Sequence, residues 1–439
     1  MLQAELGIGP EHAGMFREAV EALCAEGRLI VGAGDKVRPA SLSGEVTGVF
    51  RGHARGYGFV SPQQFADEGD VFIAAKAVGT AMSGDRVVVE IKRGGAGKDA
   101  DQLSGRVVKV IERAHRRVVG VLDRVREEWV IRPDGGDFLR TIEVEGVDAR
   151  EARKGDKVVV EIRQYPTSTR AARGVVEEVL GRPGRHDAEI SAIMRRYGLS
   201  EEFDESSLVE AWNAKSLYDP RDTQGREDLR EWLVVTIDPA DAQDFDDAIS
   251  LSRGDDGSWE LGVHIADVSY FVAKGSALDR AARRRGNSVY LPGRTVPMLP
   301  EMLSNEICSL GQGQGRYTKS VFLTYGKDGE FRAARFANTI IESKMRLSYE
   351  QAQAVIDGDA GDVPGDVAGL LADMNTLVRL IEKRRIRRGQ LQLPMAEMRM
   401  VMDEDGRVTG LEPEDSSYSH TTIEMFMVEA NVAVASLLD

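Results

Sequence analysis

The sequence predicts a multidomain α+β protein, in which two small β-barrels in tandem precede a larger mixed α+β domain. Three observations predict this fold class. The 439 residues are too many for one domain of ordinary size. Short valine-rich runs, separated by glycine and acidic turns, fill residues 44 to 180. Beyond them, strand-like runs such as WLVVTID alternate with helical ones such as GLLADMNTLVRLIEKRRIRR up to the last residue.

Composition places the chain among soluble globular proteins, with 42% hydrophobic and 29% charged residues. Its apolar runs are too short to span a bilayer, and the first residues lack the pattern of a secretory signal. Cys24 and Cys308 are too few for a disulfide framework, so we expect a cytoplasmic protein without a membrane segment. The net charge of −15 argues against binding nucleic acid through the overall field, but it leaves room for a local basic channel.

The first 41 residues predict a helix followed by a pair of short strands. Apolar residues between Phe16 and Cys24 recur at helical spacing, and Gly27 is a natural end for this helix. The following RLIVGAGDKVRP reads as strand, glycine turn and strand. Residues 1–41 are therefore either a partial winged-helix segment or an unspecialised amphipathic helix with a hairpin.

Two barrel-sized units follow, at residues 43–101 and 104–180. Each contains a Gly-Asp turn before a valine-rich strand, Gly84-Asp85 in the first unit and Gly155-Asp156 in the second. The spacing of about seventy residues indicates two copies of one unit. The segment GRPGRHD has the composition of a linker, and residues 185–439 then form the α+β domain.

The densest chemical signal is VVTIDPADAQDFDDAIS, in which five aspartates follow an apolar strand: Asp238, Asp241, Asp244, Asp246 and Asp247. Carboxylates packed this closely repel one another unless a cation compensates, and hard oxygen ligands favour Mg²⁺, Mn²⁺ or Ca²⁺. In an extended segment Asp244 and Asp246 share a face, so a bend is needed for Asp247 to join them. A solvated acidic loop is the alternative, whereas an EF-hand is excluded because its glycine and glutamate positions are not filled.

Positive charge gathers in two helical runs. They are either solvated helix faces or the walls of a channel for phosphates. The two runs are Arg280, Arg283, Arg284 and Arg285, and Lys383, Arg384, Arg385, Arg387 and Arg388.

The aspartate segment, with HIADVSYFV, the run from Leu278 to Leu310, RLSYEQA, RRGQLQLPMAE and HTTIEMFMVEAN in that order, resembles the RNase II/RNase R family, and RNase R most. The resemblance covers about residues 43 to 439. It implies two cold-shock-like, OB-type barrels before an RNB catalytic domain. The family's TSPIRRY-type arginine segment and its further oligonucleotide-binding domain do not occur in these residues, so we expect the RNB domain to be truncated at its C-terminus.

The resemblance implies a 3′→5′ exoribonuclease that hydrolyses single-stranded RNA to nucleoside 5′-monophosphates in RNA degradation and processing. Its metal would be Mg²⁺, with Mn²⁺ as a substitute, held by Asp238, Asp244, Asp246 and Asp247, and the Asp246 carboxylate would be needed for cleavage. The side chains expected to bind substrate are Tyr290, Tyr349, Tyr57, Phe59 and Phe72. Leu391 and Leu393 stand where the family places a further aromatic residue, which leaves the length of the final product open.

Single-stranded RNA is the expected partner, and we expect a monomer without a small-molecule cofactor. A second hypothesis is a catalytically weak or inactive RNA-binding protein of the same fold, because the arginine segment is missing. A third is an unrelated acidic scaffold that binds metal.

Overall fold

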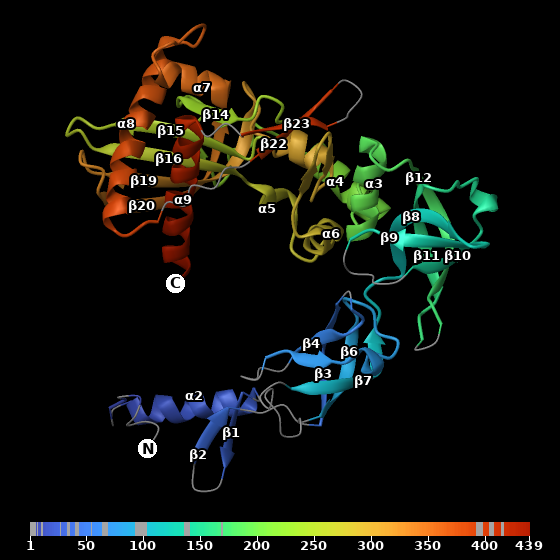
Figure 1. The fold of residues 1–439 in the computed structure, drawn as a ribbon. Coiled ribbons are helices and arrows are strands. Elements are labelled where there is room, and N and C mark those ends of the chain that lie inside the picture. Colours follow the sequence, from blue (N-terminus) through green and yellow to red (C-terminus); the bar gives the residue numbers. More distant parts are fainter. Residues whose placement is uncertain are drawn as a thin grey trace. The chain divides into compact units, whose positions relative to one another are not determined.

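The structure is a computed structural model that forms two compact units, Met1–Leu199 with Asp403–Arg407, and Ser200–Met402 with Val408–Asp439 (Figure 1). The residues described are 6, 8–9, 12–26, 28–32, 36–39, 44–53, 55–63, 69–92, 103–135, 141–167, 170–391, 398–403, 408–413 and 417–439. The predicted domain limits at residues 1, 41, 43 and 101 and Leu393 therefore lie outside the described residues.

The N-terminal segment contains one helix and a two-stranded antiparallel sheet, as the sequence predicted. Among the described residues, helix α2 buries none of its side chains. Its elements are α2 (Ala13–Ala25), β1 (Leu29–Gly32) and β2 (Lys36–Pro39).

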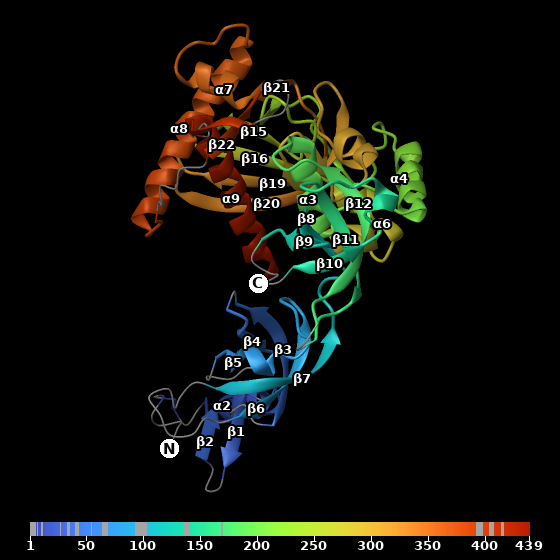
Figure 2. The same cartoon turned by 45° about the vertical axis from the view of Figure 1, so that its right-hand side comes forward.

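Two closed five-stranded barrels follow, and their strands are connected in the same way (Figures 1 and 2). The first barrel consists of β3 (Glu45–Gly52), β4 (Gly58–Pro62), β5 (Val71–Ile73), β6 (Arg86–Lys92) and β7 (Ser104–Glu112), with a 3₁₀ turn at Ala75–Ala77. The second consists of β8 (Arg117–Val125), β9 (Glu128–Pro133), β10 (Ile142–Glu145), β11 (Lys157–Gln164) and β12 (Arg173–Gly181), with a 3₁₀ turn at Asp148–Arg150. The predicted fold class of tandem barrels before an α+β domain is confirmed.

The repeated Gly-Asp turn has the same structure in both barrels. Gly84 and Gly155 have φ angles of +88° and +89°, a backbone region that favours glycine. The Asp85 carboxylate accepts the backbone N–H of Met82 at 2.9 Å, and Asp156 accepts that of Arg153 at 2.8 Å. Each aspartate is buried and closes the turn that starts the next strand, which explains why the phrase recurs in the sequence.

Helix α3 (His186–Tyr197) packs against the second barrel. Ala192 lies in one apolar cluster with Val119 of β8 and Val159 of β11. The barrel-containing unit therefore extends beyond the predicted linker to Leu199.

The second unit is built on a seven-stranded mixed sheet with the order β13-β20-β19-β16-β15-β14-β21. The strands are β13 (Glu227–Asp228), β14 (Val234–Asp238), β15 (Asp247–Arg253), β16 (Trp259–Ala266), β19 (Gly315–Tyr325), β20 (Phe331–Glu342) and β21 (Met345–Ser348). Val234 and Val235 alternate between the two faces of the sheet, and each face is covered by a separate apolar cluster. The sheet is thus the middle layer of three.

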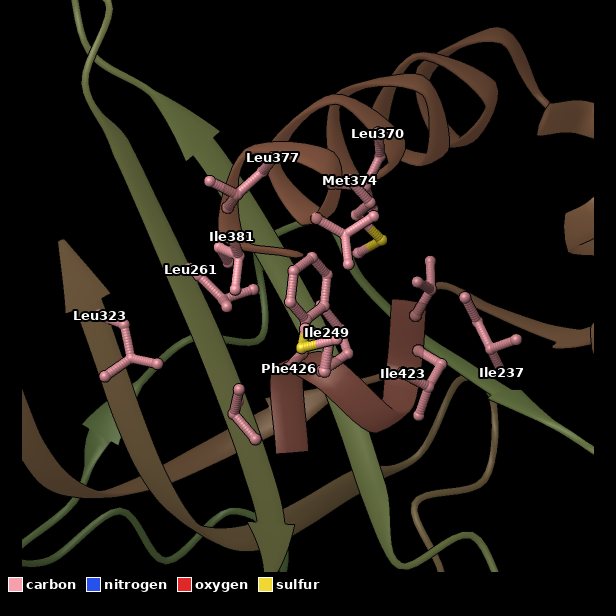
Figure 3. Close-up of a cluster of buried hydrophobic side chains, with 14 of the residues drawn as sticks. Ile237, Ile249, Leu261, Leu323, Leu370, Met374, Leu377, Ile381, Ile423 and Phe426 are labelled. Atoms are coloured by element: carbon pink, nitrogen blue, oxygen red, sulfur yellow. The ribbon is translucent and has the colours of Figure 1, made fainter. Parts of the chain in front are cut away.

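One face packs against α7 (Tyr349–Ile356), α8 (Gly365–Arg387) and α9 (Tyr418–Leu438), with Phe426 fully buried between α8 and the sheet (Figure 3). The other face packs against α4 (Glu205–Leu217), α6 (Ala277–Arg285) and the π-helical turn Met302–Ile307. The length and apolar composition of α9 would suffice to cross a membrane, but its Phe426 side packs in this core. The remaining elements are α5 (Val268–Phe271), β17 (Val289–Leu291), β18 (Arg294–Val296), β22 (Met398–Met402) and β23 (Val408–Pro413).

Candidate active site

The aspartate segment forms the connection between two neighbouring antiparallel strands. Strand β14 ends at Asp238, and β15 begins at Asp247. The chain turns between them, where the Ala242 N–H donates to the Pro239 carbonyl at 3.1 Å. This turn lies before Asp244, so the bend expected to bring Asp247 to Asp244 and Asp246 stays a prediction.

Asp238 is the most buried of the aspartates, with 8% of its surface exposed. Its Oδ2 atom is buried and has no hydrogen-bond partner. Burial, joined by the charges of Asp247, Asp244 and Asp246, raises the pKa of Asp238 to about 7, although Arg346 opposes the rise. An unpaired buried carboxylate oxygen is a position where a cation would be stabilising.

Two further aspartates are affected in the same direction. Burial, with the charges of Asp244 and Asp247, raises the pKa of Asp246 to about 6. The Asp246 side chain still has an exposed surface, so we expect water to screen part of this rise. Burial also raises the pKa of Asp247. The structure thus places Asp238, Asp244, Asp246 and Asp247 close enough for their charges to disfavour one another.

Within the described residues, no three His, Cys, Asp or Glu side chains are arranged so as to hold a metal ion as they stand. The four carboxylates nevertheless fit a hard divalent cation by their chemistry, because all their donors are oxygens and the Asp238 Oδ2 atom is unsatisfied.

Tyr290, on the short β17–β18 hairpin, lies at this cluster. Its hydroxyl donates to Asp244 Oδ2 at 2.7 Å, and this bond with partial burial raises the pKa of Tyr290 to about 12. The side chain is 65% exposed. The hydroxyl therefore binds the Asp244 carboxylate, while much of the Tyr290 ring remains accessible to a ligand.

Tyr349, the first residue of α7, is distant from Tyr290 in the sequence, but its pKa is also affected by the charges of the aspartates. Burial, then the charges of Asp247 and Asp238, raise the pKa of Tyr349 to about 12. Its ring stacks on His420 of α9, with centroids 3.6 Å apart and planes at 18°. His420 was not predicted as a site residue, because nothing in HTTIEMFMVEAN indicates that its first residue meets Tyr349.

Two other residues that the sequence did not single out hold the aspartate loop. Ser309 accepts the Phe245 N–H at 3.1 Å and donates to the Gln243 carbonyl at 3.0 Å. Arg346 of β21 donates to the Ala240 carbonyl at 2.6 Å. The parallel pairing of β14 with β21 brings Arg346 to the loop, and pairing over such a sequence distance has no local signal.

The predicted barrel residues form a separate cluster on the first barrel. The centroids of the Tyr57, Phe59 and Phe72 rings lie 5.6 to 5.9 Å apart, in edge-on or tilted arrangements. His53 stacks on Tyr57 with centroids 4.3 Å apart. All three predicted rings are half-buried, so we call Tyr57, Phe59 and Phe72 the ring platform.

The two arginine runs are largely engaged within the protein. Arg285 donates to the Ser200, Glu202 and Pro297 carbonyls, and Arg284 donates to Asp204. Arg384 is 4% exposed. The interpretation of the second run as a wholly solvated face is therefore wrong, because the side chain of Arg384 turns into the protein.

Three family models match the chain in the order of its domains. A Ribonuclease B OB domain matches residues 48–110, a cold shock domain matches 130–204, and an RNB domain matches 226–439. The RNB match contains the aspartates, Tyr290, Tyr349, Arg346 and His420.

Similar curated proteins include ribonuclease R of Aquifex aeolicus, 31% identical over 99% of this chain and 60% of its own length, and ribonuclease R of Thermotoga maritima, 34% identical over 96% and 59%. The chain thus spans about 60% of the length of these relatives. A solved structure of Mycoplasma genitalium RNase R in complex with ribose-methylated single-stranded RNA matches with a TM-score of 0.80 and 27% identity, over 90% of this chain and 62% of that one.

Proposed function

The chain belongs to the RNB-domain family that includes ribonuclease R, and from this premise we propose that it is a 3′→5′ exoribonuclease that hydrolyses single-stranded RNA to nucleoside 5′-monophosphates. The observation that carries the proposal is the aspartate loop between β14 and β15, where an unpaired buried carboxylate oxygen and three further aspartates meet the exposed ring of Tyr290. Its cellular role would be RNA degradation and processing in the cytoplasm. Its two RNA-binding domains would be the barrels β3–β7 and β8–β12, and its catalytic domain the unit that begins at Ser200. These limits differ from the predicted 43–101, 104–180 and 185–439, because β7 (Ser104–Glu112) closes the first barrel and α3 packs against the second.

Asp238, Asp244, Asp246 and Asp247 would hold Mg²⁺, for which Mn²⁺ could substitute. A bound divalent ion supplies positive charge to a phosphate and makes water a stronger nucleophile at neutral pH. The protein's own contribution is to hold the four carboxylates on one loop and to keep Asp238 away from bulk water. Asp246, the exposed member, is the carboxylate that we assign to cleavage.

Aromatic rings would hold the RNA without reading its sequence. Base stacking accepts all four bases, which suits an enzyme that degrades any strand. We assign the 3′-terminal base to Tyr290, whose hydroxyl is fixed by Asp244 while its ring is exposed. Tyr349 would be a second contact near the carboxylates, and the ring platform would bind bases further from the 3′ end.

The test uses a uniformly labelled oligoadenylate, Mg²⁺ and the 439-residue chain, with release of nucleoside 5′-monophosphate and RNA affinity measured separately. Asp246→Asn should abolish hydrolysis and leave affinity nearly intact, because affinity depends on phosphate contacts and stacking rather than on one carboxylate. Asp241→Asn is the matched control, since Asp241 is an exposed aspartate of the same loop that we assign no role.

Three outcomes discriminate the hypotheses. Hydrolysis lost in Asp246→Asn but kept in Asp241→Asn supports the assignment. RNA binding without hydrolysis by the unmodified chain would favour the inactive RNA-binding protein instead. Equal loss of affinity and hydrolysis in a folded Asp246→Asn protein would show that the loop is structural.

A further inference from the structure

Arg346 occupies a strand that lies directly beside the aspartate loop. Strand β21 pairs in parallel with β14, with Arg346 opposite Thr236 and Ser348 opposite Asp238. The aspartate loop leaves β14 immediately after this pairing ends. The backbone of Arg346 is therefore held by the sheet, whereas residues 239–246 of the loop are not part of any strand.

The guanidinium of Arg346 forms hydrogen bonds with three backbone carbonyls of that loop. Its Nη2 atom donates to Ala240 at 2.6 Å, and it lies 3.3 Å from the Pro239 oxygen and 3.4 Å from the Ala242 oxygen. These residues lie between Asp238 and Asp244. One side chain thus contacts three of the five residues that separate these two aspartates.

Two further contacts hold the arginine itself. Its backbone N–H donates to Gln312 Oε1 at 3.1 Å, and its guanidinium carbon lies 4.9 Å from the centroid of the Phe245 ring. Phe245 stands between Asp244 and Asp246. The guanidinium thereby contacts the loop on both sides of Asp244, at the carbonyls before it and at the ring after it.

The loop needs a side chain that holds its conformation, because its carboxylates repel one another. Carboxylates crowded on a short loop separate when no cation is bound, and each added degree of freedom makes capture of a cation less favourable. A planar guanidinium can donate to several carbonyls and lie over a ring at once, whereas a lysine ammonium is a point charge on a flexible stem. Charge alone would therefore not reproduce the contacts of Arg346.

We propose that Arg346 is a positioning residue that fixes the loop of residues 239–242, so that Asp238 and the carboxylates of Asp244, Asp246 and Asp247 meet at one divalent cation. This inference rests on the proposed function for the identity of the bound cation. The hold of Arg346 on the loop can be measured without any metal.

The experiment compares Arg346→Lys and Arg346→Ala with the unmodified 439-residue chain. Arg335→Ala is the control, because Arg335 likewise lies over an aromatic ring, 3.9 Å from Phe322, but its guanidinium donates to Glu227 instead of to the loop carbonyls. The first measurement is hydrogen–deuterium exchange of the Ala240, Asp241 and Ala242 amides in metal-free protein. The second is the affinity for Mg²⁺ by titration calorimetry, and the third is recovery of that affinity in Arg346→Ala on adding millimolar guanidinium.

We expect faster exchange of the loop amides in both Arg346 variants and Mg²⁺ affinity lowered by about 10- to 100-fold, the usual effect of losing a residue that orients metal ligands. Guanidinium should restore part of the affinity in Arg346→Ala, and Arg335→Ala should change neither quantity. Unchanged exchange of the loop, or full Mg²⁺ affinity in Arg346→Lys, would overturn the positioning role. If the unmodified chain bound no Mg²⁺, the proposed function would fail, while the exchange measurement would still decide whether Arg346 holds the loop.

Discussion

Glu429 is predicted to be a charged residue on which the stability of the second unit strongly depends. It is 8% exposed and binds Arg384, which is 4% exposed. It also accepts from Arg385 at 3.0 Å and from the Tyr325 hydroxyl at 3.0 Å. Glu429→Gln keeps the shape of this side chain but leaves the guanidinium of Arg384 buried without a counter-charge.

Breaking a buried ion pair by removing one partner costs about 3–5 kcal/mol of unfolding free energy. We expect about 3 kcal/mol for Glu429→Gln, because the amide oxygen still accepts one bond. In a unit of this size that loss lowers the melting temperature by roughly 6–12 °C. Glu330→Gln is the matched control: Glu330 binds Arg387 and Arg388 at the same end of α8 but is 43% exposed, so its loss should cost less than about 1 kcal/mol.

The difference in unfolding free energy between the unmodified chain and Glu429→Gln should also depend on pH. Burial raises the pKa of Glu429, but its bonds to Arg384, Arg385 and Tyr325 outweigh burial and hold it below its usual value. A lowered pKa contributes stability above the unfolded pKa of about 4.3, and this contribution is lost as the pH falls through the lower folded value. The gap between the unmodified chain and Glu429→Gln should therefore narrow below about pH 4. Calorimetry at pH 7.5 and pH 3 measures both effects, and equal losses in Glu429→Gln and Glu330→Gln at pH 7.5 would refute the reasoning.

The remaining predictions concern ligands. RNA affinity should fall steeply between low and physiological salt, since phosphate neutralisation releases counterions whatever the net charge; a flat response in filter binding would count against a basic RNA channel. Tyr290→Ala should change the length of the shortest remaining oligonucleotide on a sequencing gel, whereas Tyr197→Ala, which removes another exposed tyrosine, should not. The raised pKa values of Asp238 (about 7) and Asp246 (about 6) stabilise the metal-free fold at low pH, and this stability is lost as the pH rises through those values. Mg²⁺ should therefore raise the melting temperature more at pH 8 than at pH 5, and an equal rise at both would contradict the metal assignment.

Features that depend on local sequence could be predicted. The two barrels were predicted from the Gly-Asp turns, because the positive φ of Gly84 and the buried carboxylate of Asp85 are needed at one fixed place in each copy. The aspartates were likewise predicted to follow an apolar strand directly, and β14 ends at Asp238. In both cases residues close in sequence determine the geometry.

Features that depend on distant pairing could not be predicted. Arg346 reaches the aspartate loop only because β21 lies beside β14, and the sequence gives no register for that parallel pair. Arg384 was counted with its basic neighbours, but its partner Glu429 is 45 residues further along the chain. A run of charges in the sequence therefore predicts neither which members are exposed nor which are already paired.

The two barrels share their fold but not the ring platform, so they should differ in RNA binding. Their registers can be matched through Gly48 opposite Pro62 and Gly120 opposite Pro133, and at both glycines a Cβ atom would lie 2.4 Å from a carbonyl oxygen of the facing strand.

Across β4 and β5 of the first barrel, Phe59 pairs with Phe72. The corresponding pair across β9 and β10 is Val130 with Glu143, and Glu143 binds Arg173 at 2.6 Å. A carboxylate in place of a ring repels phosphates and offers no surface for stacking. We therefore expect Phe59→Ala or Phe72→Ala to weaken binding of single-stranded RNA by roughly 5- to 100-fold, the loss of one stacked base, and Glu143→Gln to have little effect. If Glu143→Gln weakened binding as much as the phenylalanine variants, with circular dichroism unchanged in all three, the second barrel would bind RNA through this face after all.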